Sequence, residues 1–186
     1  MNETINTILS RRSIRNYSTE QVKQNDLDLI VKAGLYAPSG HNQQSWHFTV
    51  VQDKELIDSL SNATKEEMAK TDNEFLQEKA SDANFHLFYH SPTIIVISGE
   101  NAAIVPNIDC AAAAQNMLIA AESINIGTCW IGLLAYLFRS DRIAEFTKLL
   151  GIPEGYTPYY AITVGYKNIE KQEAFPRREN TVNYIR

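Results

Sequence analysis

The sequence predicts a single α+β domain over residues 1–186. Runs rich in β-branched and aromatic residues predict strands at 46–51, 93–98 and 159–164. Segments with apolar residues at helical spacing lie between and before these runs, and the longest covers residues 109–125. No internal repeat, low-complexity segment or linker divides the chain, so we expect one domain.

The first two predicted elements are helices. Apolar residues at helical spacing, Ile5, Ile8 and Leu9, predict a helix from Glu3 to about Ser10. A second helix is expected to begin at Asn25-Asp26, which suit an N-cap, and to stop before Pro38. Its apolar positions are Leu27, Leu29, Ile30, Ala33 and Leu35.

Strands and charged helices are expected next. Residues 46–51 are rich in β-formers and predict a strand. Residues 54–88 are charged and helix-prone, and their charges suit a solvated helical face. The continuous apolar run 93–98 follows Ser91-Pro92 and is typical of a buried strand.

The helix predicted at 109–125 is apolar over most of its circumference, so we expect it to be central. Gly127 is expected to end it, and residues 128–134 are expected to be extended. Ser140-Asp141 suit the cap of a further helix that runs to Leu150.

The last predicted strand, 159–164, ends at Gly165. The polar tail from about residue 168 to residue 186 has no core pattern of its own. It therefore needs another surface to hold it.

Composition limits the partners. The net charge of −5 argues against nucleic acid as the main partner and makes any arginine cluster a local feature. The sequence contains no run approaching the ~20 apolar residues that span a bilayer, so we expect no membrane partner. Two cysteines, Cys110 and Cys129, are too few for a disulfide framework, and we expect a cytoplasmic protein.

Several common catalytic motifs are missing from the sequence. There is no Gly-x-Gly-x-x-Gly, no phosphate loop and no Gly-x-Ser-x-Gly elbow. His86 and His90 have metal-ligand spacing, but two ligands without a third do not make a site. Cys129 has no evident histidine partner, so we interpret it as a buried structural thiol.

Three arginines surround one serine after the first predicted helix: Arg11, Arg12 and Arg15 around Ser13. Guanidinium groups bind phosphate in bidentate fashion, and a hydroxyl adds a short donor. Arginines at a helix end also interact favourably with the helix dipole, so this alternative stays open.

A second cluster is the polar loop that precedes the first predicted strand. Pro38, Ser39 and Gly40 predict a turn, and the amides of Asn42 to Gln44 require hydrogen-bond partners. This loop suits the edge of a planar heterocycle, and an ordinary helix-to-strand loop remains the alternative.

Two weaker features complete the candidate site. The backbone N–H groups of Ile131 and Gly132 lie in a short extended segment, where a glycine lets a ligand ring approach closely. In the tail, Arg177 and Arg178 form another basic pair, which suits either a phosphate site or a solvated tail.

Together these motifs resemble the FMN-dependent nitroreductase family in kind, order and spacing, over nearly the whole chain. The resemblance implies a three-layer α/β/α fold with a central, mainly antiparallel sheet. It also implies an intertwined homodimer, with two FMN sites at the subunit interface and the tail extending onto the partner.

The resemblance also assigns roles to residues. Arg11 and Ser13 would hold the FMN phosphate, with Arg178 and Arg177 closing the site from the tail. Arg12 would lie near the phosphate and ribityl chain, and Arg15 near N1 and O2 of the flavin. The remaining cofactor-binding residues implied are Pro38, Ser39, Gly40, Asn42 and Gln44 from the partner subunit, Asn84 at the pyrimidine edge, and the backbones of Ile131 and Gly132.

Two positions depart from the family pattern. Ser45 stands where a proline commonly precedes the tryptophan, which loosens the loop. Leu87 stands close to where a second cation often lies, which leaves Arg15 to supply the charge near N1.

The implied activity is an NAD(P)H oxidoreductase that reduces nitroaromatic, quinone-like or related small acceptors by a ping-pong hydride mechanism. No catalytic side chain is assigned, because the chemistry belongs to the flavin. A dehalogenase, an azoline oxidase, and a flavin-binding sensor or storage protein remain as alternatives. Aromatic residues between 64 and 90 and between 134 and 138 are candidates for the substrate slot or for ordinary core: Phe75, Phe85, Phe88, Tyr89, Tyr136 and Phe138.

Overall fold

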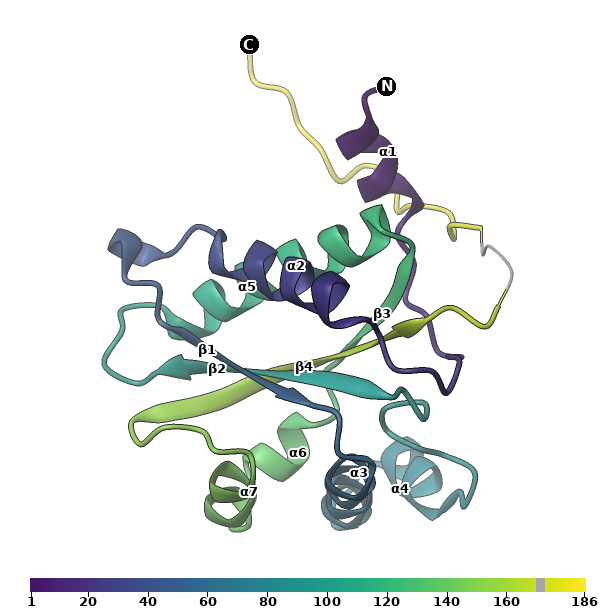
Figure 1. Cartoon of the computed structure of the whole chain (residues 1–186), viewed down its shortest axis with the longest axis vertical. Coiled ribbons are helices and arrows are strands. Elements are labelled where there is room, and N and C mark those ends of the chain that lie inside the picture. The colour runs from purple at the N-terminus through teal and green to yellow at the C-terminus, as the bar shows by residue number, and fades with distance from the viewer. Residues whose placement is uncertain (170–172) are drawn as a thin grey trace.

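The computed structural model describes residues 1–169 and 173–186, and its centre is a four-stranded sheet (Figure 1). The strands are β1 (Trp46–Val51), β2 (Thr93–Glu100), β3 (Ile126–Ile131) and β4 (Tyr156–Tyr166). Their order in the sheet is β1-β2-β4-β3, and every neighbouring pair is antiparallel. The expected antiparallel sheet is confirmed.

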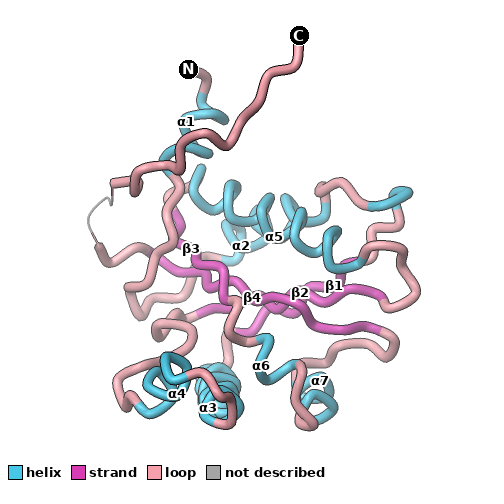
Figure 2. The backbone as a smooth tube through the Cα atoms, turned by 180° about the vertical axis from the view of Figure 1, so that it is seen from behind, coloured by secondary structure: helices cyan, strands magenta, loops and turns pink. Residues whose placement is uncertain are grey.

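Helices cover both faces of the sheet. α2 (Gln24–Leu35) and α5 (Pro106–Ser123) lie on one face, as Figures 1 and 2 both show. The other face carries α3 (Lys54–Ala69), α4 (Glu74–Ser81), α6 (Ala135–Phe138) and α7 (Ile143–Leu149). The expected three-layer α/β/α class is therefore confirmed. Helix α1 (Glu3–Ser10) projects beyond the layers, and a short 3-10 turn, η1, covers Gly40–Asn42.

The central strand β2 explains why two cores form. Its side chains alternate between the faces, and all of its residues from Thr93 to Gly99 are buried. Ile95 and Ile97 pack with Met117 of α5. Ile94 and Val96 pack in the other core, with Phe146 of α7. The apolar run 93–98 was therefore correctly interpreted as a strand buried on both faces.

Several predicted boundaries were wrong. The second helix begins at Gln24, after Lys23 and without a side-chain cap, so Asn25 and Asp26 lie inside it. Residues 54–88 hold two helices, α3 and α4, followed by turns rather than helix. The helix predicted to start at Ser140-Asp141 begins at Ile143, and the four-residue α6 before it was missed.

The end of α5 also differs from the prediction. The helix spans Pro106–Ser123, with a proline in its first turn, and Asn125 adopts the left-handed conformation at φ 60° that reverses the chain. Gly127 lies inside β3 instead, where a Cβ would come within 3.0 Å of Ile14 and Lys167 side-chain atoms. This glycine therefore permits close packing rather than ending the helix.

Among the residues that the structure describes, no helix combines the length and apolarity needed to span a membrane.

Candidate flavin site

The arginine cluster lies along the edge strand β3. After α1 ends, Ser13 forms a parallel bridge with Thr128, and the N–H of Ile14 donates to the Thr128 carbonyl at 2.8 Å. Because β3 is the last strand of the sheet, it has a free edge for residues 11–15 to occupy. The sheet itself therefore positions this cluster.

Cys129 is the residue on which the cluster converges. Its thiol is buried, and that burial raises the thiol pKa above its ordinary value, while Arg15, Ser13 and Arg11 each act in the opposite direction. Three side chains of the cluster thus act on one thiol of β3. The raised pKa fits the interpretation of Cys129 as a structural thiol.

Within the described part of the chain, no carboxylate forms an ion pair with this cluster. No ion pair among residues 1–169 and 173–186 includes Arg11, Arg12 or Arg15. The Nε of Arg15 donates to the hydroxyl of Tyr89 at 3.3 Å, and its guanidinium carbon lies 5.7 Å from the centre of that ring. The cluster is therefore suited to an anion.

Arg12 behaves differently from its neighbours. Its Nη1 donates to the carbonyls of Leu9 at 2.8 Å and Arg11 at 2.6 Å, so part of this side chain serves the end of α1. The alternative interpretation, an arginine that interacts with the end of its helix, thus holds for the Nη1 atom of Arg12. Its Nε is buried and has no hydrogen-bond partner among the residues that the structure describes, which leaves one donor unused there.

The polar loop before β1 is organised by Asp109 of α5. One oxygen of this buried carboxylate accepts from the Gly40 N–H at 2.9 Å, and the other accepts from the Ser45 hydroxyl at 2.7 Å. The N–H of Gln44 donates to the Ser39 hydroxyl at 2.9 Å. Sequence reasoning missed Asp109, although a carboxylate at the start of an otherwise apolar helix was a signal, because it has to find buried partners.

Three loop residues adopt left-handed backbone conformations: His41 (φ 51°), Asn42 (φ 55°) and Gln44 (φ 50°). Such conformations are costly for residues other than glycine and persist where the surroundings hold them. The Gln44 side-chain amide donates to the Asn42 side chain at 3.3 Å, and all three residues are exposed. Neighbouring contacts therefore fix the conformation of this loop, and the side-chain amides of Asn42 and Gln44 are exposed.

The two clusters lie at opposite ends of α5. The 39–45 loop contacts Asp109 near the start of that helix, whereas residues 11–15 lie by β3, beyond its end (Figure 1). An 18-residue helix is about 27 Å long. One chain therefore does not bring the arginine cluster and the loop to the same ligand.

An open cavity of about 560 Å³ lies beside Gly132. No atom lies within 4 Å of where a Gly132 Cβ would be, so the main chain is accessible there. Of the aromatic candidates, Tyr136 lines this cavity, whereas Phe88 and Phe138 are buried core residues. The other lining residues are Asn107, Trp130, Leu133, Ala135, Arg139, Tyr159 and Tyr160.

Comparison with known proteins identifies the family. The model of the nitroreductase family matches residues 8–166. The chain belongs to the nitroreductase family.

The similar proteins cover nearly all or all of this nitroreductase-family chain. An Archaeoglobus fulgidus protein named putative NADH dehydrogenase/NAD(P)H nitroreductase is 34% identical, covering 92% of this chain and 89% of its own. A Bacteroides fragilis nitroreductase solved with bound FMN has a TM-score of 0.92 and 33% identity, with all of both chains covered. A Desulfitobacterium hafniense nitroreductase, also with bound FMN, has a TM-score of 0.91 and 30% identity over the same coverage.

Three predicted site residues are exposed in this nitroreductase-family chain. Arg177 and Arg178 are exposed in a tail that extends past α1, away from the sheet (Figures 1 and 2). Asn84 is exposed, and its N–H donates to Asp82. None of these three side chains forms a hydrogen bond with the Arg11–Arg15 cluster within the described part of the chain.

The histidine pair does not form a metal site. His86 and His90 stack with ring centres 4.3 Å apart, and residues 1–169 and 173–186 contain no group of three or more metal-ligating side chains. His86 instead bonds to Asp58 of α3 at 3.2 Å.

Proposed function

We propose that this protein is an FMN-dependent NAD(P)H oxidoreductase that works as a homodimer and reduces nitroaromatic, quinone-like or related small acceptors. The observation that carries the proposal is the arginine cluster around Ser13, which forms no ion pair within residues 1–169 and 173–186. The cluster lies along β3, the strand that leads to the accessible backbone of Gly132. Relatives support it, since one is named an NAD(P)H nitroreductase and two solved structures contain FMN.

The phosphate of FMN would be bound by Arg11 and the Ser13 hydroxyl. Their charge and donors match a dianion, and the unpartnered Nε of Arg12 adds one more donor to the same cluster. Arg177 and Arg178 would close this site from the tail. The donor set therefore fits the charged end of the cofactor.

The ring of FMN would lie between Arg15 and the backbone of Ile131 and Gly132. When bound, FMN would supply the hydride chemistry between NAD(P)H and the second substrate, which would bind in turn in a ping-pong order. Arg15 would supply a positive charge near N1 and O2, where negative charge would develop. Asn84 would meet the pyrimidine edge, and water or substrate would supply protons.

A second copy of the chain would complete each site. The chain's own arginine cluster lies at the other end of α5, so the loop residues would contact the flavin of the partner subunit. These residues are Pro38, Ser39, Gly40, Asn42 and Gln44. The tail would extend onto the partner. Exposed apolar side chains support this arrangement, since α1 buries none of its residues within one chain. The apolar residues concerned are Ile5, Ile8 and Leu9 in α1, Ile104 and Ile108 near the start of α5, and Phe175, Val182, Tyr184 and Ile185 in the tail.

The proposed electron donor and the two unpaired cysteines fit a reducing cytoplasm.

Flavin binding followed by turnover tests the proposed function. We expect the purified protein to bind FMN and to oxidise NADH or NADPH continuously when a nitroaromatic or quinone is added. Stopped-flow reduction with each nucleotide compares the two donors. Protein that is colourless and takes up no added FMN would contradict the proposal. Flavin that is reduced once without steady-state turnover would favour a sensor or storage role instead.

A further inference from the structure

The turn that carries Tyr89 is held by the ring of one histidine. Within residues 86–91, the Nδ1 of His86 accepts from the Phe88 N–H at 3.2 Å and from the His90 N–H at 3.3 Å. The carbonyl of His86 also accepts from the Tyr89 N–H at 2.9 Å. One residue thus receives three of the turn's backbone donors.

This turn is strained at the residue that reaches the arginine cluster. Tyr89 and His90 both adopt left-handed conformations, with φ values of 53° and 54°. Such conformations are unfavourable for residues other than glycine, so neighbouring contacts must hold them. Phe88 is fully buried and Leu87 nearly so, which anchors the turn on one side. The His86 ring holds it on the other.

The accepting role of Nδ1 requires a neutral imidazole. Nδ1 faces two N–H donors, so the ring proton must lie on Nε2, which faces the carboxylate of Asp58 at 3.2 Å. Lys54 donates to the other oxygen of Asp58 and lowers the pKa of that carboxyl. Three contacts therefore fix the tautomer of His86. The N–H groups of Phe88 and His90 face Nδ1, and the carboxylate of Asp58 faces Nε2.

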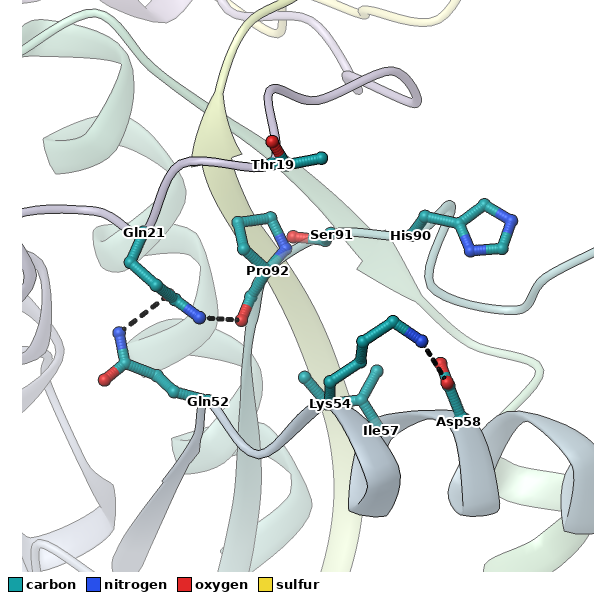
Figure 3. Close-up of a pocket in the computed structure, with 9 residues that line it drawn as sticks. All are labelled: Thr19, Gln21, Gln52, Lys54, Ile57, Asp58, His90, Ser91 and Pro92. Atoms are coloured by element: carbon teal, nitrogen blue, oxygen red, sulfur yellow. Dashed lines mark hydrogen bonds and ion pairs between the residues drawn. The ribbon is translucent and has the colours of Figure 1, made fainter.

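His86 faces three charged or titratable groups: Asp58 and Lys54 of α3, and His90 of the turn itself. Burial and the adjacent His90 lower the pKa of His86 below its ordinary value, although Asp58 acts in the opposite direction. A cavity of about 200 Å³ is lined by His90, Lys54 and Asp58 (Figure 3). Solvent protons therefore reach the surroundings of this ring.

We propose that His86 is a positioning residue that, as a neutral imidazole, fixes the 86–91 turn and so holds Tyr89 against Arg15. The proposal rests on the proposed function for the role of Arg15 at the flavin. A proton on Nδ1 would face two N–H donors and remove their acceptor. The turn is then released, Tyr89 leaves the Nε of Arg15, and the guanidinium loses its fixed position.

The expected pH dependence has a definite sign. Because the pKa of His86 is lowered in the folded protein, the ordered turn is fully present above the unfolded-state pKa of about 6.5. It is lost as the pH falls through the lower folded-state value. Flavin reduction by NADH is therefore expected to slow in the acid range, by about threefold to tenfold, as for the loss of one hydrogen bond.

Two variants with single-turnover stopped flow test this inference on the FMN-loaded protein. His86→Asn places a non-titrating amide oxygen near the Nδ1 position, so we expect it to keep the rate of the unmodified protein at neutral pH and to abolish the acid decline. His90→Asn is the matched control, because asparagine suits a left-handed position. It should keep the decline but move it to higher pH, because the imidazole that lowers the pKa of His86 is removed. An acid decline in His86→Asn equal to that of the unmodified protein would overturn the proposal.

A second readout does not depend on turnover. ¹⁵N NMR is expected to show the Nε2–H tautomer of His86, and the Arg15 Nε–H signal is expected to shift as His86 titrates. Tyr89→Phe should give the shifted Arg15 signal at every pH. An Arg15 signal that ignores the titration of His86 would overturn the proposal. Failure to bind FMN would instead contradict the proposed function, while this coupling stays measurable in the flavin-free protein.

Discussion

Replacing Arg11 and Arg178 together with alanine is expected to weaken FMN binding by about 10²- to 10⁴-fold, as measured by flavin fluorescence titration. Each guanidinium would donate a charge-assisted hydrogen bond to the phosphate, worth about 1.5–3 kcal/mol. No ion pair in the described part of the chain includes either residue, and Arg178 is exposed. The thermal stability of the flavin-free protein should therefore change little, within about 0.5 kcal/mol.

Arg186→Ala is the matched control for this pair. It removes one positive charge from the same exposed tail as Arg178, eight positions beyond it, and should leave the FMN dissociation constant nearly unchanged. A double variant that binds FMN as tightly as the unmodified protein would contradict the assignment of Arg11 and Arg178 to the FMN phosphate. Equal losses of FMN affinity in the control and in the double variant would show that general tail charge, not a phosphate contact, is responsible.

Replacing Asp109 with alanine is expected to lower the free energy of unfolding by about 2–4 kcal/mol, measured by urea denaturation of the flavin-free protein. The substitution leaves the Gly40 N–H and the Ser45 hydroxyl without their shared acceptor. It also removes a negative charge from the first turn of α5, where the helix dipole favours it. Because the 39–45 loop would lose its anchor, FMN affinity should fall as well.

Two comparisons isolate the role of the Asp109 carboxylate. Ser45→Ala removes one partner and should cost about 1 kcal/mol. Asp141→Ala removes an exposed carboxylate that makes no ion pair in the described residues, and it should change stability by less than about 0.5 kcal/mol. If Asp109→Ala proved no more destabilising than Asp141→Ala, the anchoring role would be wrong.

The sequence predicted those elements whose signals are local. The strand Trp46–Val51 and the helix Glu3–Ser10 match their predictions, because β-formers and helical spacing each mark a whole element. The predictions were less accurate for the ends of helices and strands that depend on tertiary packing. Gly127 reads as a helix terminator in sequence, yet its small size serves contact with Ile14, which lies 113 positions earlier.

In the candidate site, too, the features with local signals were predicted and the long-range contacts were missed. The arginines and the amide loop were evident as clusters, because their members are neighbours in sequence. Asp109 was missed because its partner Gly40 is 69 positions away. Tyr89 was proposed only as a substrate-slot residue, and its bond to Arg15 spans 74 positions. Such contacts depend on how the sheet orders its strands, which local patterns do not encode.

The central claim is that one flavin site combines the arginine cluster of one chain with the 38–44 loop of the other. Mixed dimers test it directly. One chain carries Arg11→Ala with Ser13→Ala, its partner carries Ser39→Ala with Asn42→Ala, and two different affinity tags isolate the heterodimer. If the sites are shared, both defects fall in one site and the other site is intact. We then expect one FMN bound per heterodimer with the affinity of the unmodified protein, although neither variant binds FMN well as a homodimer. A heterodimer without any site of unmodified affinity would contradict the claim.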